Sequence, residues 1–303
     1  MLDSAAIAAA ETFIWLNARI LDRHRYAYLF KGGDPEAVVA ALRPYQNADG
    51  GFGNAIEPDS RGQASQPTHG ATALEILDEV GQFQLPLATR TLDYLASVAT
   101  PEGGVPIAFP SIRLAPRAPW WDVGEDDPPA SLLPTASIVG LMHKHGIQPS
   151  WLAAATDFCW RSIAAISTTH PYEVEYGVKF LDNAPDRSRA GREAERLGQL
   201  VRTQRLVLLD PDTPDQPPVS PGYAPGEYHS PLDYAPSPAS LARRWFSDGE
   251  IERNLDLLER AQGADGGWSF NWRAWNAATT IEWRGWVTIR ALTILRAYGR
   301  LPG

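Results

Sequence analysis

Apolar positions recur with helical spacing over most of this chain, and no stretch of useful length alternates apolar and polar residues as a strand does. Pro or Asp opens many of the helical stretches, where residues that cap or begin a helix are expected. The pattern predicts eleven helices, over residues 3–30, 35–46, 67–80, 86–99, 129–145, 150–166, 171–183, 187–204, 237–246, 248–262 and 283–299.

Four long links separate groups of these helices, at residues 53–66, 107–128, 205–236 and 269–282. They are rich in Trp, Tyr, His and carboxylate side chains. Links of this length in a compact domain usually carry a function, because shorter connections suffice to join helices. We therefore look to the links for the chemistry of the protein.

One sequence motif occurs twice, once near each end of the chain. Residues 46–53 read Gln-Asn-Ala-Asp-Gly-Gly-Phe-Gly, and residues 262–268 read Gln-Gly-Ala-Asp-Gly-Gly-Trp. Paired glycines permit positive φ where a helix stops, Asp can bond the backbone of the turn, and the Gln amide can satisfy terminal backbone groups. A third, altered copy ends in Gly103-Gly104, and the runs at 151–166 and 200–204 fill the remaining places. A period of roughly 50 residues indicates stacked supersecondary units.

The pattern Leu-x-x-x-Gln-x-x-Asp-Gly-Gly-Phe/Trp resembles the repeat of the squalene-cyclase and protein-prenyltransferase β-subunit superfamily. The resemblance implies an all-α fold, an α/α toroid in one domain over residues 1–303. It also implies about five outer helices, ending near residues 46, 99, 166, 204 and 262. Six inner helices would begin near residues 3, 67, 129, 171, 237 and 283.

Composition narrows the class of protein. The 303 residues are 44% hydrophobic and carry a formal net charge of −9, which argues against nucleic-acid binding, since phosphate neutralisation needs a basic face. No segment reaches the roughly 18 apolar residues of a membrane span, and the start of the chain does not read as a signal peptide. A single cysteine, Cys159, fits a reducing compartment. We expect a cytoplasmic protein whose partner is a small-molecule substrate.

If the inner helices run parallel, their amino-terminal ends share one rim, and a long link precedes several of them. The rim includes Asp59, His69, Glu175 and Tyr223 among its aromatic and acidic residues. Such a rim suits a carbocation, stabilised by aromatic rings, or a sugar stacked on them. The predicted substrate-binding residues are Trp120, Trp121, Tyr172, His229, Trp272, Arg273, Trp275 and Glu282.

The sequence Gly124-Glu-Asp-Asp-Pro resembles the Asp-x-Asp-Asp motif with which class II terpene cyclases protonate an alkene, although Gly124 stands at the first Asp. The resemblance assigns Asp126 as the proton donor beside Asp127, kept protonated by desolvation and by neighbouring carboxylates. Alternatively, Asp127 caps a helix that begins with Pro128 and Pro129.

Prenyltransferase β-subunits suggest a zinc site instead, because the chain contains Asp157-Phe-Cys159 with His170 and His229 downstream. Residues 157 and 159 fall within a predicted outer helix and face different directions, so we expect a buried, inert Cys159 and no metal or other cofactor.

Some glycosidases, epimerases and pectate lyases are also helical toroids, and for them Glu57 with Asp59, or Glu173 with Glu175, could supply acid and base. A non-catalytic small-molecule-binding protein is a third reading. The favoured one is a terpenoid-cyclase-like enzyme for a hydrophobic or prenyl-derived substrate, with Asp126, Asp127, Glu57 and Glu173 as candidate catalytic residues.

Overall fold

The computed structural model describes residues 1–210, 212, 220 and 223–302. This part of the chain contains twelve α-helices and four 3-10 helices, and its only strands are two-residue segments, β1 (Val105–Pro106) and β2 (Ala130–Ser131), which pair antiparallel. The predicted all-α class is therefore confirmed. The chain divides into two compact units: unit 1 holds Met1–Tyr26, Thr168–Val178 and Ala194–Gly303, and unit 2 holds Ala27–Ser167 and Lys179–Glu193.

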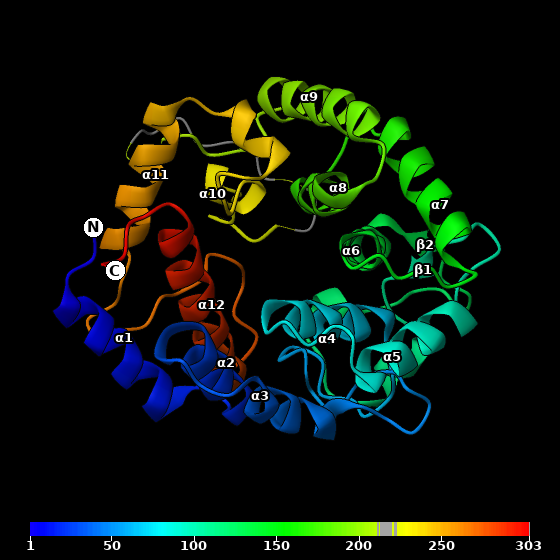
Figure 1. Cartoon of the computed structure of the whole chain (residues 1–303), viewed down its shortest axis with the longest axis horizontal. Helices are drawn as coiled ribbons and strands as arrows, with labels where there is room; N and C mark the ends of the chain where they lie inside the picture. The colour runs from blue at the N-terminus through cyan, green and yellow to red at the C-terminus, as the bar shows by residue number, and fades with distance from the viewer. Residues whose placement is uncertain (211, 213–219, 221–222, 303) are drawn as a thin grey trace. The chain divides into compact units, whose positions relative to one another are not determined.

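Unit 2 is built from successive helices. They are α3 (Pro35–Leu42), η1 (Arg43–Tyr45), α4 (Pro67–Glu79), α5 (Pro86–Ser97), η2 (Pro110–Leu114), η3 (Pro119–Trp121), α6 (Leu132–Lys144) and α7 (Leu152–Ala165). Helix α4 packs against α5 and α6, and α6 packs against α7 (Figure 1). Because α6 is covered on both sides, every residue from Pro134 to Met142 is buried, and α6 forms the centre of the apolar core of this unit.

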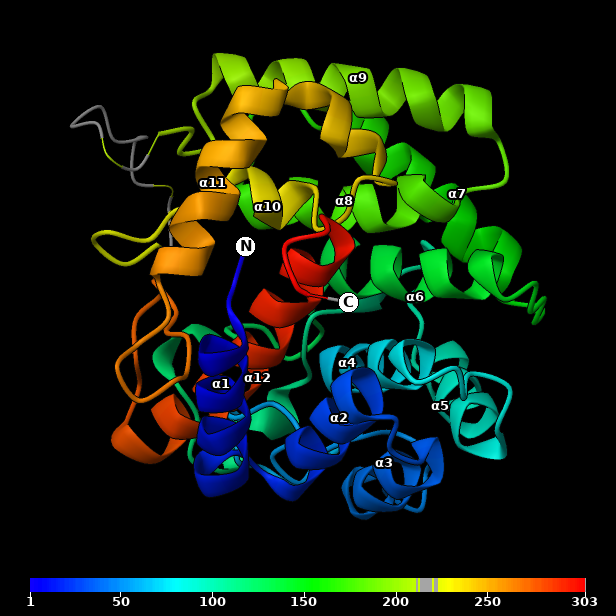
Figure 2. The same ribbon diagram turned by 60° about the vertical axis from the view of Figure 1, so that its left-hand side comes forward.

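Unit 1 joins the two ends of the chain. It contains α1 (Ser4–Asn17), α10 (Pro231–Tyr234), η4 (Leu241–Trp245), α11 (Asp248–Arg260) and α12 (Ala277–Ala297). Helix α12 packs against both α1 and α11, and Figure 2 shows α1 beside α12. Fully buried Phe13, Leu255, Trp268 and Leu292 form its core. Three helices contribute to both units: α2 (Ile20–Lys31), α8 (Pro171–Asn183) and α9 (Arg187–Thr203).

Several predicted helices differ from the observed ones, and three of them differ most. The segment 3–30 is two helices, because the backbone is extended at Ala18 (φ −77°, ψ 156°) between α1 and α2. The segment 237–246 contains only the short 3-10 helix η4. Helix α12 begins earlier than residue 283, since Asn276 caps it by accepting hydrogen bonds from the N–H groups of Ala278 and Thr279, at 3.0 and 3.1 Å.

The three copies of the repeat motif form the same turn. The first glycine of each pair has positive φ, 92° at Gly50, 98° at Gly103 and 89° at Gly266. The carbonyl of the second glycine accepts a hydrogen bond from the N–H four residues earlier, at 2.8 Å in every copy. Phe52 and Trp268, the closing rings, are fully buried. The predicted glycine turn is confirmed, including its altered third copy.

The motif's Gln ties each turn to another helix. Gln46 Nε2 donates to the carbonyls of Gly50 (3.0 Å) and of Leu87 in α5 (3.1 Å). Gln262 Nε2 donates in the same way to Gly266 and to Ala6 in α1, both at 2.8 Å. In the third copy, where Ala99 replaces Gln, the indole N–H of Trp151 donates to the Gly103 carbonyl at 2.8 Å. A residue of the next repeat thus supplies the missing donor.

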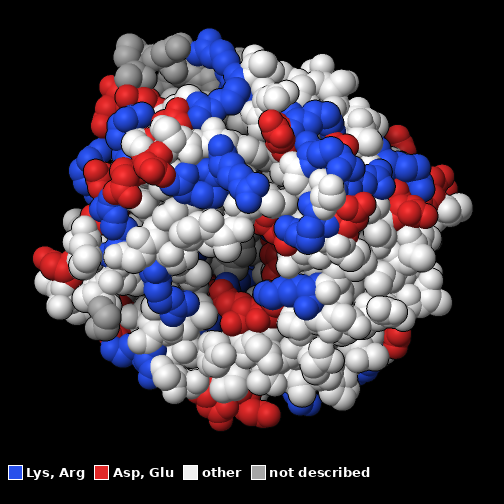
Figure 3. Space-filling model, turned by 45° about the horizontal axis from the view of Figure 1, so that its top comes forward, with Lys and Arg blue, Asp and Glu red and all other residues white. Residues whose placement is uncertain are grey.

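Charged side chains of both signs are interspersed on the face drawn in Figure 3. Arg300 in unit 1 pairs with both Asp256 and Glu259 of α11, at 3.0 Å each, so these two carboxylates are neutralised locally. No helix among the described residues combines the length and the hydropathy needed to cross a membrane.

Candidate functional site

Most residues of the link at 53–66 are buried, although the link lacks regular secondary structure. The carboxylic residues Glu57 and Asp59 are only 8% and 2% exposed. Just before them, Asn54 and Ala55 have positive φ, 56° and 64°. Alanine rarely adopts this conformation, because its Cβ crowds the backbone, and backbone strain of this kind clusters at functional sites. A strained loop therefore holds two carboxyl groups inside unit 2.

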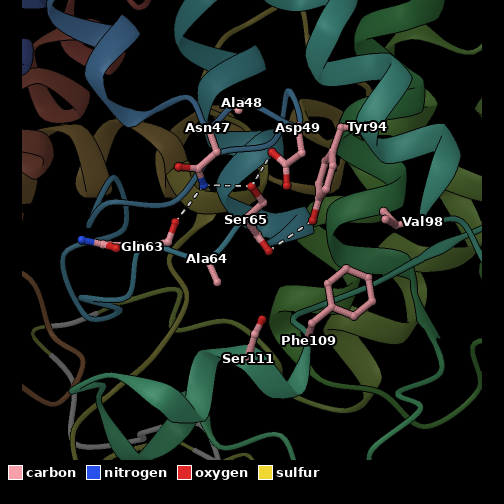
Figure 4. Close-up of a pocket in the computed structure, with 10 residues that line it drawn as sticks. All are labelled: Asn47, Ala48, Asp49, Gln63, Ala64, Ser65, Tyr94, Val98, Phe109 and Ser111. Carbon is pink, nitrogen blue, oxygen red and sulfur yellow. Dashed lines mark hydrogen bonds between the residues drawn. The ribbon is translucent and has the colours of Figure 1, made fainter.

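The far end of this link is tied to the first glycine turn (Figure 4). Asn47 Nδ2 donates to the Gln63 carbonyl (2.7 Å) and to Ser65 Oγ (2.9 Å). Ser65 Oγ donates to the Asp49 carboxylate (2.8 Å), and the Tyr94 hydroxyl donates to the Ser65 carbonyl (3.1 Å). These residues line an open groove of about 840 Å³. The repeat motif thus positions the acidic link as well as ending a helix.

The second link of unit 2, at 107–128, packs against the first. The Ala118 N–H donates to the Asp59 carbonyl at 2.8 Å, and Ser60 pairs antiparallel with Arg117. Beyond this pairing the short helix η3 carries Trp121. Residues from two links that are far apart in sequence therefore meet around Asp59.

His69 belongs to the first turn of α4 and is 0% exposed. Its ring meets the Trp121 ring edge-on, with the centroids 6.0 Å apart. Burial lowers the pKa of the imidazole to about 4, because the charged form is kept from water; an interaction with the Phe52 backbone opposes this only in part. His69 is therefore neutral at pH 7, with one N–H donor and one nitrogen acceptor.

Several buried polar atoms around the two links form no hydrogen bond of good geometry with any residue that the structure describes. They are Ser60 Oγ, Arg117 Nε, the indole nitrogen of Trp121 and both ring nitrogens of His69. A buried polar atom without a partner costs about 1–3 kcal/mol, so such atoms are rare and need an explanation. We call residues 57–69 and 117–121 the link site, since the buried acids and these atoms lie there.

The predicted acid motif lies outside this buried region. The side chain of Asp126 is 95% exposed and pairs with Arg113 at 2.7 Å, and Asp127 is also exposed. A proton donor to an alkene has to be kept from water, whereas Asp126 lies in water in this structure. Trp120 is 44% exposed and Trp121 half-buried, so only the second of these predicted rings contributes to the link site.

The alternative role of Asp127 as a helix cap is wrong. Helix α6 begins only at Leu132, and its cap is Ser131, whose Oγ accepts from the Leu133 N–H at 3.3 Å. The reason lies in the preceding residues, because Ala130 and Ser131 are extended and pair with β1.

A second cluster of predicted residues lies in unit 1, around His229. Nε2 of His229 lies 3.0 Å from the Glu175 carboxylate, and its Nδ1 forms a hydrogen bond with the Tyr223 hydroxyl. The Tyr172 ring packs edge-on against His229, with centroids 4.6 Å apart, and its hydroxyl donates to Glu227 at 3.2 Å. Burial, and then the neighbouring carboxylates, raises the pKa of the Tyr172 phenol. The cluster is closely packed, and its polar atoms form hydrogen bonds with one another.

The other predicted residues of unit 1 are spread more widely. Glu173, in the first turn of α8, accepts a hydrogen bond from the Thr169 hydroxyl. Trp272 stacks on Phe270, with centroids 4.4 Å apart, and meets Trp283 edge-on at 5.3 Å. Arg273 is exposed and Trp275 half-buried, and Glu282 lies within α12 rather than in the link before it.

The cysteine is placed as expected for an inert thiol. Cys159 lies in α7 and is fully buried, and burial raises the pKa of its thiol. It belongs to unit 2, whereas His170 and His229 belong to unit 1. Within the described ranges, no group of three His, Cys, Asp or Glu side chains could hold a metal ion.

Ser60 and Arg117 could not be identified as candidate residues from the sequence, because neither residue type marks chemistry by itself. The signal was their neighbourhood, since Ser60 follows two acids and Arg117 lies three residues before the Trp pair. Asp59 and His69 were expected on a shared rim, and the structure places both in the link site.

Comparison with known proteins gives a match in structure alone. No known family matches the sequence, and no curated protein matches it either. A crystal structure of a protein from Actinoplanes matches with a TM-score of 0.60, over 98% of this chain and 99% of that chain, at 16% identity. Type II terpene cyclase MstE from Scytonema, a variant in complex with its substrate geranylgeranyl dihydroxybenzoate, matches with 0.59, over 97% of each chain, at 13% identity.

The same cyclase without ligand matches with a TM-score of 0.52, over 98% of this chain and 89% of that chain, at 14% identity. At these identities the likeness shows a shared fold. The resemblance drawn from the glycine repeat is confirmed to that extent: the chain has the all-α fold of type II terpene cyclases.

Proposed function

We propose that this protein is a terpene-cyclase-like enzyme that protonates a hydrophobic, prenyl-derived small molecule at the link site. One observation carries the proposal: the strained link at 53–66 keeps the carboxyl groups of Glu57 and Asp59 out of water. The terpene-cyclase fold supports it, because MstE, which shares that fold, is a cyclase with a prenylated substrate.

Asp59 is the residue that we assign as the proton donor. Alkenes are weak bases, so the acid has to be a carboxyl group kept un-ionised by removal from water. Asp59 is the less exposed of the two acids, and the hydrogen bond from Ala118 to its carbonyl fixes its backbone. Trp121 follows Ala118 by three residues and its ring meets His69, and the face of such a ring suits a carbocation.

The reaction that follows is an isomerisation. The Asp59 carboxyl proton adds to a terminal alkene carbon, and the resulting cation is attacked by the next double bond. The cyclised cation then loses a proton, which returns, directly or through water, to the Asp59 carboxylate and restores the acid. Substrate and product have the same mass, and the reaction needs no oxidant or reductant. The residues of the link site supply the proton and exclude water from the cation.

The test compares three matched Asp→Asn variants with geranylgeranyl dihydroxybenzoate as the probe, since that compound is the substrate of MstE. Asp59→Asn should reduce formation of an isomeric product by about 10³-fold or more, because the amide keeps the shape but holds no acidic proton. Asp93→Asn, on the exposed side of α5, should leave the rate unchanged. Product is measured by chromatography with mass detection.

Asp126→Asn separates this proposal from the sequence motif. If that change abolishes turnover while Asp59→Asn does not, the acid is the exposed motif and the link site is not catalytic. If the wild-type protein forms no isomer from this probe or from other prenylated phenols and polyprenes, the cyclase proposal fails.

A further inference from the structure

The open groove of about 840 Å³ in unit 2 has no part in the proposed acid catalysis. It is lined by the first glycine turn, the far end of the link at 53–66, the carboxyl-terminal part of α5 and the start of η2. The described residues that line it do not include Glu57, Asp59 or Trp121. Its volume lies in the range of about 300–1,000 Å³ that is usual for small-molecule sites. The groove is therefore a candidate for a second binding site.

Two copies of the repeat motif differ in the partner of their aspartate. In the copy near the carboxyl end of the chain, Asp265 accepts from both terminal nitrogens of Arg284, at 2.7 Å each. Asp49 has the same place in the first copy, and its Oδ1 accepts from the Gly51 N–H (2.9 Å) and from Ser65 Oγ (2.8 Å). Its Oδ2 bonds to no residue that the structure describes, and the side chain lines the groove. A carboxylate oxygen that is neutralised in one copy is thus available to a ligand in the other.

The groove also offers apolar surface and a hydroxyl donor. Figure 4 shows Tyr94, Val98 and Phe109 on its right-hand side. Phe109 is half-buried, so part of its side chain is accessible to a ligand. Ser111 Oγ accepts from Gln66 Nε2 at 3.0 Å, and its own proton can be donated to a further acceptor. Apolar ring surface, a donor and an acceptor therefore line one groove.

The charges at this turn offset each other. Of the described residues that line the groove, only Asp49 is charged. Arg90 Nη2 donates to the carbonyls of Asn47 (3.3 Å) and Ala48 (3.1 Å), on the turn that carries Asp49. A guanidinium on the same turn reduces the attraction of the carboxylate for a cation, and the carboxylate itself disfavours an anion. A neutral ligand rich in hydroxyl groups suits this groove best.

We propose that the groove binds a neutral carbohydrate, with the apolar face of a sugar ring against Phe109 and its hydroxyl groups bonded to Asp49 and Ser111. A sugar has both an apolar C–H face and hydroxyl groups that donate and accept, which matches the two kinds of surface. Because the groove is open, a chain of sugars can extend from it into solvent. This binding function is additional to the proposed cyclisation and does not depend on it.

The test titrates the full-length protein, by isothermal calorimetry, with four neutral hexasaccharides, those of glucose, mannose, galactose and xylose. At least one should bind with a Kd of about 1 mM or tighter. Two charged probes, the hexamers of galacturonate and of glucosamine, measure the preference for a neutral ligand. Both should bind more weakly than the best neutral probe, the galacturonate hexamer by about tenfold or more, because Asp49 repels its carboxylates.

Matched variants assign the binding to the groove. In Asp49→Asn the side-chain oxygen can still accept from Gly51 and Ser65, but an amide nitrogen replaces the available oxygen and cannot accept. This change should weaken binding of the best neutral probe by about tenfold, since it removes a hydrogen bond to a charged group. Asp265→Asn, the same change in the other copy, should leave the affinity unchanged. Thermal unfolding by circular dichroism checks that both variants are folded.

Three outcomes would overturn the proposal. In the first, none of the four neutral hexasaccharides binds. In the second, a charged hexamer binds more tightly than every neutral one, and the ligand class is wrong. In the third, Asp49→Asn and Asp265→Asn have the same effect on affinity, and the sugar binds elsewhere. None of these results bears on the cyclase proposal, which is tested separately through Asp59.

Discussion

Replacement of Gly266 by Ala should destabilise unit 1 strongly. This glycine has a φ of 89°, and a Cβ built on it would lie 2.2 Å from the Ala9 carbonyl oxygen and 2.4 Å from the Ala9 carbonyl carbon. Both atoms belong to the backbone of α1, which cannot move aside as a flexible side chain can. Close approach of the turn to this helix is therefore possible only for glycine.

Two terms set the size of the effect. A left-handed conformation costs a non-glycine residue about 1–2 kcal/mol. Displacing the backbone of a packed helix costs about 1–3 kcal/mol more. We expect Gly266→Ala to lower the free energy of unfolding by about 3 kcal/mol, a large part of the stability of an ordinary domain.

Gly299 provides the matched control, because it lies in the same unit, has a φ of 70°, and a Cβ there would meet nothing within 4 Å. Gly299→Ala should therefore cost only the backbone term, about 1 kcal/mol. Urea unfolding followed by far-ultraviolet circular dichroism measures both variants. Equal losses in the two would show that the turn does not press against α1, and the account of the repeat would be refuted.

Two further outcomes follow from burial. The pKa of His69 is about 4 in the folded protein against 6.5 for an ordinary histidine, so the unfolded chain binds the extra proton and stability falls by about 3 kcal/mol as the pH drops from 6.5 to 4. The difference in unfolding free energy between wild type and His69→Phe should vary over this range and be constant above it; a difference independent of pH would show that His69 is accessible to protons. The buried Cys159 should resist a thiol-reactive disulfide reagent until the protein unfolds, and the purified protein should hold no stoichiometric zinc. Rapid labelling in the native state, or about one zinc per chain by elemental analysis, would contradict this.

The glycine turns could be predicted from sequence because their chemistry is local. A glycine with positive φ, an Asp that accepts from the backbone N–H two residues later and a Gln that donates to its own turn all lie within eight residues. The break at Ala18 could not, since neither Gly nor Pro marks it and its extended backbone depends on packing.

The candidate site, too, could be predicted only in part from the sequence. Composition predicted that the long links hold the candidate site, and it drew attention to Glu57 and Trp121. The burial of Asp59 could not be predicted from composition. It depends on the second link, in which Ala118, 59 residues further along the chain, donates to the Asp59 carbonyl. Asp126 lies in a sequence that resembles a known motif, but its exposure depends on tertiary packing, which a local sequence pattern does not predict.

The discontinuity of unit 1 has a consequence for how the protein is made. Gln262 bonds to Ala6, the Leu2 N–H donates to the Arg300 carbonyl at 3.0 Å, and the amino-terminal ammonium group pairs with Glu259 at 2.9 Å. During synthesis α1 is therefore made well before α12 and the turn at Gln262, which supply its partners.

The helices from α4 to α7, in contrast, pack on one another over short separations in sequence. Contacts of short sequence separation form early and those of long separation late. The nascent chain is thus expected to condense from its middle, with the apolar face of α1, which includes Phe13 and Ile14, waiting uncovered. Chaperone binding to the amino terminus during translation would protect the very residues that complete the fold at its final step.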